Sequence, residues 1–438
     1  MRPSIVPVSS RRAADSSAHL VDTQGSLDSA RRLLIVAWEY PGVSSRRGSA
    51  LARRVGQLAR GFTRHGWRVD VLHNAHDLEP LPLAEGSGVV SLYAARARNT
   101  GTPDNRSVVT RRLATAWYAA RHGDRSEQWA RIARRMLVEF DAMPPTLVIG
   151  CFTPRGPLSV ARAAAERWNV PWIADLQDPA LEGASRRLQL LVARWMRRTL
   201  RSAFAVVQVS PEWARADSMV LQRQVTTLRH AVPAVPPTSK VTSRSPADRF
   251  VLLYAGSIIK GHQSPAPLMQ ALARLNEHNG RSIVLEVAGA EATCEAFRAC
   301  LPRNEANAWF RPLGWLGTED LSAAMQLAHC LVLVPSSEAG RPVVPSKLYE
   351  YMAFDRPVLV AGNDAGGLDS LYEEWGHRNV TCAGADSIAM ALDAARNGDF
   401  SRLLRRSGCA HAPMEESQLI DRYVSLAEQA LGVRKSVA

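Results

Sequence analysis

The chain has 438 residues, of which 46% are hydrophobic and 22% charged, and its formal net charge is +13. These values are those of a soluble globular protein with enough residues for two domains of about 200 residues each. No apolar run approaches the roughly 18 residues of a membrane span, and the first residues lack the apolar stretch of a secretory signal. We therefore expect a cytoplasmic protein whose six scattered cysteines are reduced and bind no zinc.

In the first half, residues 1–30 are rich in Ser, Arg and Ala without apolar periodicity, which predicts a disordered leader. After this leader, short apolar runs alternate with helically spaced segments, a pattern typical of the βαβ units of a parallel sheet. The predicted strands cover 33–37, 69–72, 146–149, 171–175 and 205–209, and the predicted helices run from about 49 to 66 and over 156–168. The pattern indicates an N-terminal Rossmann-like domain over 31–235.

A Pro/Ser/Thr-rich segment then predicts a linker over 236–249. A second alternation follows, with predicted strands over 250–254, 283–288, 330–334 and 357–360 and predicted helices over 265–276, 319–328 and 346–354. It indicates a C-terminal Rossmann-like domain over 250–415, and residues 416–438 are expected to form a helix that packs back on the first domain. The predicted fold class is α/β, with two doubly wound domains facing across a cleft.

The charge is divided unevenly along the chain. Residues 1–240 hold 35 basic and 19 acidic residues, whereas residues 241–438 hold 19 basic and 22 acidic residues. This division predicts an anionic partner for the first half. An anionic membrane surface is favoured over nucleic acid, because the chain contains no recognised nucleic-acid-binding module.

One segment of the basic half has a second feature that bears on membranes. Six apolar residues recur at helical spacing among arginines: Leu188, Leu191, Val192, Trp195, Met196 and Leu200. An ordinary helix with one face in the core accounts for this stripe, and so does an interfacial helix on anionic lipid. Residues 106–135 are a similar candidate.

The strongest chemical signal lies between residues 335 and 360. A buried strand ends in a loop of small residues, and a helix is predicted to begin near Ser346, where its free N–H groups can hold a diphosphate. Lys347 adds a positive charge in the first turn, and Glu350 lies one turn further on, placed to accept hydrogen bonds from ribose hydroxyls. The same residues also fit a helix with Ser346 as its N-cap and Glu350 simply exposed.

Four segments together resemble a known family. The run Pro-Ser-Lys-Leu-Tyr-Glu-Tyr-Met-Ala at 345–353, followed by the strand at 357–360, resembles the donor-binding segment of GT-B retaining glycosyltransferases, in the family 4-like branch that makes bacterial surface polysaccharides. Residues 254–262 are similar to that family's Gly-rich phosphate loop, and residues 171–179 resemble its P-W-x-x-D-x-x-D segment. Glu39-Tyr40-Pro41 with Gly48 resembles its first loop. The resemblance spans residues 33 to about 362 in the family's order.

The resemblance implies a hexosyl- or glycosyltransferase that moves a sugar with retention from a UDP- or GDP-linked donor, without a metal or other cofactor. The donor would bind the C-terminal domain, and the acceptor, a lipid-linked molecule or a growing surface glycan, the N-terminal domain. The implied donor-binding residues are Gly256, Ser257, Lys260, His262, Ser346, Lys347, Leu348 and Glu350, with Gly48 in the first-domain loop. No catalytic residue is implied, although Asp178 and Glu338 are candidates. We expect an enzyme peripheral on the inner face of the cell membrane.

The sequence also departs from the family pattern. Many members carry two glutamates separated by seven residues, but Pro342 occupies the first place, and Ser257 and His262 stand where the phosphate loop usually offers an arginine. Two alternatives stay open: a GT-B sugar-nucleotide epimerase, which would need a pair of acid/base carboxylates in the cleft, and a catalytically weak binding subunit that lost the first glutamate and the arginine. The chain has only four lysines, however, and two of them, Lys260 and Lys347, lie in the two donor loops.

Overall fold

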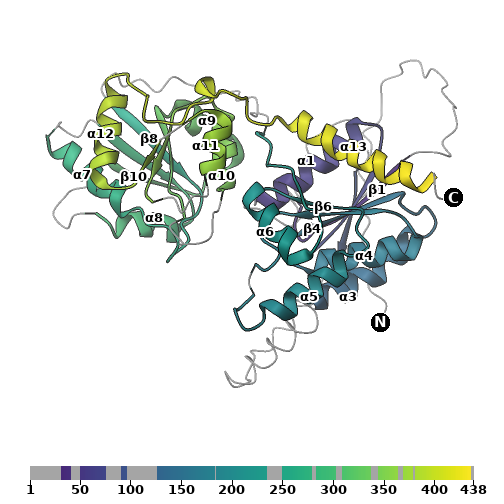
Figure 1. Cartoon of the computed structure of the whole chain (residues 1–438). Coiled ribbons are helices and arrows are strands. Elements are labelled where there is room, and N and C mark those ends of the chain that lie inside the picture. Colours follow the sequence, from purple (N-terminus) through teal and green to yellow (C-terminus); the bar gives the residue numbers. More distant parts are fainter. Residues whose placement is uncertain are drawn as a thin grey trace, which may run out of the picture. The chain divides into compact units, whose positions relative to one another are not determined.

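The structure is a computed structural model of the chain, and the described residues fall into two compact units (Figure 1). The described residues are 31–40, 50–74, 90–95, 126–182, 184–233, 249–278, 283–301, 308–336, 344–363, 368–377 and 380–435. Unit 1 consists of Met1–Arg229 with Ser417–Ala438, and unit 2 is His230–Glu416. The predicted leader, nearly all of the predicted linker, Gly48 and Glu338 lie outside the described residues.

Unit 1 is built on a parallel sheet that has seven strands within the described residues, in the order β3-β2-β1-β4-β5-β6-β7. The strands are β1 (Arg32–Val36), β2 (Arg68–Asn74), β3 (Val90–Ala95), β4 (Leu147–Phe152), β5 (Trp172–Leu176), β6 (Ala205–Gln208) and β7 (Thr226–Thr227). All residues of β1, β4 and β5 are buried, as expected when helices cover both faces of a parallel sheet.

Helices cover both faces of the unit 1 sheet (Figure 1). They are α1 (Ala50–Arg64), α3 (Glu127–Met136), α4 (Gly156–Trp168), α5 (Gln189–Leu200), α6 (Pro211–Leu221) and α13 (Glu416–Lys435), with a short 3₁₀ turn at Leu137–Phe140. The C-terminal helix α13 packs against α1 so closely that a Cβ on Gly61 would overlap Ile420. His65, the residue that follows α1, contacts the Asp421 carboxylate on α13 at 3.2 Å. The helix α13 therefore completes unit 1, although it follows unit 2 in the chain.

Unit 2 repeats this architecture with a sheet that has six strands within the described residues, in the order β10-β9-β8-β11-β12-β13. The strands are β8 (Phe250–Ala255), β9 (Ile283–Ala288), β10 (Phe310–Gly314), β11 (Cys330–Leu333), β12 (Val358–Ala361) and β13 (Thr381–Cys382). The helices are α7 (Ala266–His278), α8 (Glu291–Arg298), α9 (Thr318–Leu327), α10 (Ser346–Met352), α11 (Asp369–Trp375) and α12 (Ala385–Arg396), with a 3₁₀ turn at Arg406–Gly408. One core cluster joins the sheet to α7, α8 and α12, and another joins it to α9, α10 and α11.

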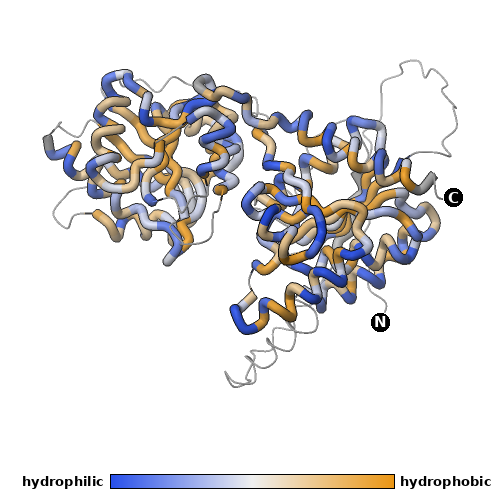
Figure 2. Tube along the Cα trace, viewed as in Figure 1, coloured by the Kyte–Doolittle hydropathy of each residue, from blue (hydrophilic) through white to orange (hydrophobic). Residues whose placement is uncertain are grey.

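In both units the strands are apolar and the outer helix faces are polar, as Figure 2 shows for each unit. The predicted α/β class with two Rossmann-like domains is therefore confirmed, and the predicted helix over 156–168 coincides with α4. The sequence patterns did not predict β3, β7, β10 or β13, nor α6, α8, α11 or α12. Among the described residues, no helix combines the length and the apolar character that crossing a membrane requires.

Candidate functional site

The candidate site lies at the point where the strand order of unit 2 reverses. Strands β8 and β11 are neighbours in the sheet, but α7, which follows β8, covers one face, and α10, which follows β11, covers the other. At such a reversal the loops at the carboxyl ends of the two strands diverge and leave room for a ligand. Residues 256–264 follow β8, residues 334–336 follow β11, and residues 344–345 precede α10, so the described parts of both predicted donor loops lie at this end of the sheet.

At this point the side chain of Lys347 crosses the backbone of Gly256. The Lys347 ammonium donates hydrogen bonds to the Tyr254 hydroxyl, at 2.6 Å, and to the Ser257 carbonyl oxygen, at 2.9 Å. Gly256 has a φ of +119°, and a Cβ there would lie 2.7 Å from Nζ and closer still to Cε. Only glycine both adopts this backbone conformation readily and leaves space for the lysine.

The loop after β9 packs equally closely. The Gly256 N–H donates to the Ala288 carbonyl at 2.8 Å, and a Cβ on Gly289 would overlap the Gly256 oxygen. The carboxyl ends of β8 and β9 therefore pack backbone against backbone at two glycines, and the Gly289 N–H is itself bonded to the Gly314 oxygen at 2.8 Å.

The Lys347 ammonium is held in a largely desolvated position. Burial lowers the pKa of Lys347 to about 8, although the negative charge of Glu350 opposes this shift. In the part of the chain that the structure describes, both hydrogen-bond partners of the ammonium are neutral oxygens. At neutral pH the site therefore contains a positive charge that no carboxylate of the described residues neutralises by a direct hydrogen bond, which is suited to receiving an anion.

Helix α10 is fixed to β8 by a second residue one turn beyond Lys347. The Tyr351 hydroxyl accepts from the Ala255 N–H at 2.9 Å and donates to the Ala255 oxygen at 3.3 Å. The N-cap is Pro345, and Ser346 is the first helical residue, so the reading of Ser346 as N-cap is wrong. Because α10 has seven residues, its dipole is small, and Lys347 supplies most of the positive charge at this end.

The other predicted donor residues lie around this centre in different ways. Ser257 and Lys260 are exposed, and His262 and Glu350 are half-buried. The Leu348 side chain is fully buried in the core below α10, so it supports the helix. Gln263, which the sequence reading did not single out, ties the loop to β11 by donating to the Val334 oxygen at 2.6 Å.

In unit 1, Asp178 lies just beyond β5, beside the end of β4. Its carboxylate accepts a hydrogen bond of 2.6 Å from the Thr153 hydroxyl. Burial raises the pKa of Asp178, the Thr153 hydrogen bond lowers it, and the negative charge of Glu182 raises it further, with a net increase. The carboxylate is half-buried and its position at the carboxyl edge of the sheet allows contact with a ligand.

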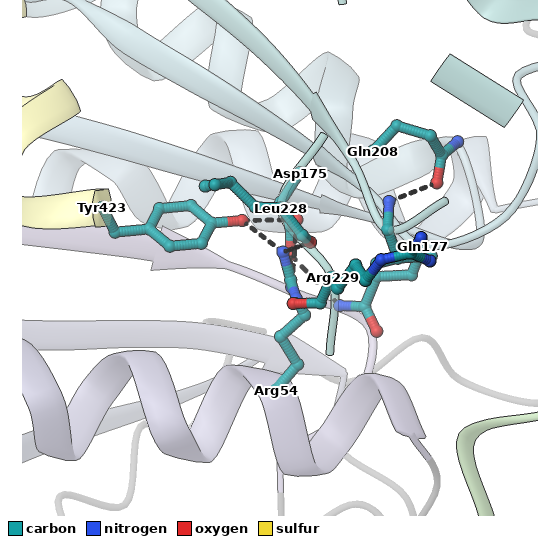
Figure 3. Close-up of polar contacts among 8 residues, drawn as sticks. Arg54, Asp175, Gln177, Gln208, Leu228, Arg229 and Tyr423 are labelled. Carbon is teal, nitrogen blue, oxygen red and sulfur yellow. Dashed lines mark hydrogen bonds and ion pairs between the residues drawn. The ribbon is translucent and has the colours of Figure 1, made fainter. Parts of the chain in front are cut away.

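A buried ion pair beneath this edge joins four segments of unit 1 (Figure 3). Arg54 on α1 donates from Nε to both Asp175 oxygens, at 3.2 and 3.0 Å, and both side chains are fully buried. Its two Nη atoms donate to the Leu228 and Arg229 carbonyl oxygens at 3.0 Å. The Tyr423 hydroxyl on α13 accepts from Arg54 at 2.8 Å and donates to Asp175 at 2.6 Å.

Local sequence carries only partial signals for these contacts. Arg54 lies three residues after Leu51 and four before Leu58, which places it on the apolar face of α1 and could have marked it as buried. Lys347 and Tyr351 are four residues apart and so share a helix face. Their partners on β8 and β5 are distant in sequence, and no local pattern marks them.

The arginine-flanked stripe over 188–200 is divided between the core and the surface. Val192, Met196 and Leu200 are buried, which agrees with the ordinary core-helix reading for those positions. Leu190 and Leu191 are 82% and 44% exposed, however, and the arginines 186, 187 and 194 beside them are exposed as well. The remaining apolar surface is a small leucine pair surrounded by positive charge.

Two parallel α/β units, one with the Lys347 ammonium lying across Gly256 at its switch point, define a protein of the Rossmann-like α/β class. Comparison with family models specifies the class further. Residues 49–228 match the model described as glycosyl transferase 4-like domain, and residues 249–396 match the model described as glycosyl transferases group 1. The chain therefore belongs to the family 4-like glycosyltransferases of the GT-B fold.

Solved structures share this fold across nearly the whole chain. Sucrose-phosphate synthase from Thermosynechococcus elongatus is 14% identical with a TM-score of 0.59, covering 93% of this chain and 99% of its own. HepE from Anabaena, in complex with UDP and glucose, is 12% identical with a TM-score of 0.56, covering 90% and 99%. A protein from Listeria monocytogenes described as a putative UDP-N-acetylglucosamine 2-epimerase is 8% identical with a TM-score of 0.53, covering 91% and 96%. Comparison with curated protein sequences returned no match.

Proposed function

We propose that this glycosyltransferase transfers a sugar, with retention, from a UDP- or GDP-linked donor bound by unit 2 to an acceptor bound by unit 1. The observation that carries the proposal is the Lys347 ammonium held across Gly256 at the switch point of unit 2. A diphosphate has the charge and the acceptor oxygens that an ammonium and free backbone N–H groups bind. The complex of HepE, a protein of the same fold, with UDP and glucose agrees with this choice.

In this proposal the protein itself neutralises the diphosphate leaving group, with no metal ion or other cofactor. Lys347 contacts the diphosphate, and Lys260 in the exposed loop after β8 adds a second charge as the donor binds. Ser257, His262 and Ser346 complete the phosphate surroundings, and Glu350 accepts hydrogen bonds from the ribose hydroxyls. Placing these charges around the leaving group before the reaction lowers the barrier to its departure.

The acceptor proposal rests on unit 1. Asp178, at the carboxyl edge of the sheet, is placed to orient an acceptor hydroxyl. The positive charge of residues 1–240 and the exposed leucine pair on α5 favour a lipid-linked or glycan acceptor reached at an anionic membrane surface. The enzyme would then be peripheral on the inner face of the cell membrane.

The first experiment is a thermal-shift screen of UDP, GDP and their common sugar conjugates, because a ligand that binds the folded state raises its melting temperature. Donors that bind are then incubated with and without a lipid-linked acceptor. Sugar transfer that depends on the acceptor supports the proposal. Acceptor-independent conversion of the donor sugar identifies an epimerase, and binding without turnover identifies a binding subunit. Activity should survive EDTA, and a loss that manganese restores would contradict the metal-free proposal.

Glu350→Gln tests the ribose contact. A hydrogen bond to a charged group contributes roughly 1.5–3 kcal/mol, so the KM for the donor should rise about tenfold or more. Glu373→Gln is the matched control, because Glu373 is an exposed helical glutamate on α11 of the same unit. Unchanged donor constants in Glu350→Gln would exclude the ribose role.

A further inference from the structure

Tyr254 and Lys347 approach each other from opposite faces of the unit 2 sheet. The Tyr254 ring is fully buried in the core cluster that includes α7 and α8, and it packs at 4.9 Å from the Phe297 ring. Helix α10, which carries Lys347, packs on the other face. The lysine side chain therefore crosses the carboxyl end of β8 to reach the tyrosine, and the missing Cβ of Gly256 leaves the space for it.

Three contacts fix the ammonium at the end of this path. The Tyr254 hydroxyl accepts from Nζ at 2.6 Å and donates to the Ser257 oxygen at 2.8 Å, and that oxygen also accepts from Nζ at 2.9 Å. The ammonium lies 4.4 Å from the centre of the Tyr254 ring, within the range of a cation–π contact. The Lys347 ammonium, the Tyr254 hydroxyl and the Ser257 carbonyl therefore form a closed triangle of hydrogen bonds. In it the tyrosine hydroxyl donates to the loop carbonyl and accepts from the ammonium.

We propose that Tyr254 is a positioning residue for donor binding, which holds the Lys347 ammonium over Gly256 so that it meets the donor diphosphate without reorganising. This inference rests on the proposed function, and it gives a role to Tyr254, which begins the phosphate-loop segment but is not among the implied donor-binding residues. An unrestrained lysine loses much of its side-chain freedom when it binds a ligand, and a lysine already held in place does not.

The protonation behaviour of the site is consistent with this role. Among the described residues, the titratable groups that face Lys347 are Tyr254 on β8 and Glu350 on its own helix. Burial, with a smaller contribution from Tyr351, raises the pKa of Tyr254 above its ordinary value, so the hydroxyl remains a neutral acceptor. Burial likewise lowers the pKa of Lys347 to about 8, against the charge of Glu350, so the site loses its positive charge in mildly alkaline solution.

The first test needs no ligand and uses the fact that the chain has only four lysines. In the full-length protein labelled with ¹³C at lysine Cε, Lys347→Met identifies the Lys347 signal by its disappearance. We expect this signal to be displaced by the ring current of Tyr254 and to titrate near pH 8, below the ordinary lysine value. Tyr254→Phe keeps the ring and removes the hydroxyl, so the released lysine should lose the ring-current displacement and titrate closer to the ordinary lysine value of about 10.4.

The second test measures UDP and GDP binding by calorimetry in a double-mutant cycle. Tyr254→Phe should weaken binding of the nucleotide that the wild type prefers by about tenfold, which corresponds to about 1.4 kcal/mol. In a Lys347→Met background the same change should have no further effect, because Tyr254 acts only through the lysine. Wild-type affinity should also decline above pH 8, and the affinity of Lys347→Met should stay flat across that range.

Tyr372→Phe is the matched control, because its hydroxyl, on α11 of the same unit, contacts the Thr381 hydroxyl at 2.9 Å. It should reduce stability but change nucleotide affinity by less than twofold. The inference is overturned if Tyr254→Phe leaves the Lys347 signal unmoved, or if its effect on affinity adds fully to that of Lys347→Met. If the wild type binds neither nucleotide, the proposed function fails as well, whereas binding that depends on Lys347 but not on Tyr254 removes the inference alone.

Discussion

Replacing Arg54 by methionine removes the central cation of the buried network in unit 1 while keeping an unbranched side chain of similar length. Asp175 would keep only the Tyr423 hydroxyl at 2.6 Å and the Gln177 amide at 3.2 Å as described hydrogen-bond donors. The Leu228 and Arg229 carbonyl oxygens would lose the donors that Arg54 supplies. Removing one partner of a buried ion pair typically costs about 3–5 kcal/mol, because the other charge stays buried without compensation.

We expect a loss of about 4 kcal/mol in the unfolding free energy of unit 1, or roughly 8–16 °C in its melting temperature. Urea unfolding followed by hydrogen exchange, read on peptides from α1 and β5, separates this unit from unit 2. The matched control is Arg215→Met, because the Arg215 side chain is 75% exposed and its ion pair with Glu212 is long, at 3.9 Å. Adding Asp175→Asn to Arg54→Met should recover about 2 kcal/mol relative to the sum of the single changes. A loss below about 1 kcal/mol, or additive single changes, would refute the account of the network.

Three further outcomes follow from other features. Gly256→Ala should displace Lys347 and strain a backbone whose φ is +119°. We expect calorimetry to show nucleotide binding weakened at least tenfold, and we expect the unfolding free energy to fall by roughly 1–2 kcal/mol. Unchanged nucleotide binding would contradict the close contact between Gly256 and Lys347. Burial raises the pKa of Asp217 to about 6, against hydrogen bonds from Gln208 and the Ala180 N–H. This folded-state pKa exceeds the unfolded value, so the folded protein holds the proton more tightly than the unfolded chain does. In urea titrations, the unfolding free energy of the wild type relative to Asp217→Asn should therefore fall by up to about 3 kcal/mol from pH 4 to pH 7. A rise over this pH range would be the contrary result. Replacing both Leu190 and Leu191 by serine should reduce co-sedimentation with anionic vesicles and leave stability unchanged. Binding of the wild-type protein to these vesicles should weaken as the salt concentration rises. Equal binding to neutral vesicles would count against the membrane proposal.

The fold was predictable where strands are continuous apolar runs. Residues 33–37 and 283–288 read as buried strands because helices cover both faces of these sheets, and the sequence reflects that burial directly. The strand β10 was not predictable, because its sequence Phe-Arg-Pro-Leu-Gly includes an exposed arginine and a proline, which an edge strand tolerates. Short helices such as α8 and α11 were missed for a similar reason, since seven or eight residues give too few turns for a clear period.

The candidate site was predictable in its loops but not in its contacts. The glycines and the lysine of the two loops are visible in sequence, because phosphate binding requires small residues and charge close together. The hydrogen bond from Lys347 to Tyr254 forms because β8 and β11 are neighbours in the sheet, and only the sheet topology brings these two strands together. The Asp178–Thr153 bond likewise depends on β4 lying beside β5.

The position of α13 determines when unit 1 can finish folding during synthesis. Unit 2 is one uninterrupted segment, but the Tyr423 hydroxyl that bridges Arg54 and Asp175 in unit 1 is synthesised only after unit 2 is complete. At about 5–20 residues per second, unit 1 waits roughly ten to forty seconds on the ribosome for this residue. During that interval the face of α1 around Gly61, which Ile420 later covers, is open to solvent and to other nascent chains. Chaperones that act during synthesis should therefore bind unit 1 more than unit 2, even though most of unit 1 leaves the ribosome first.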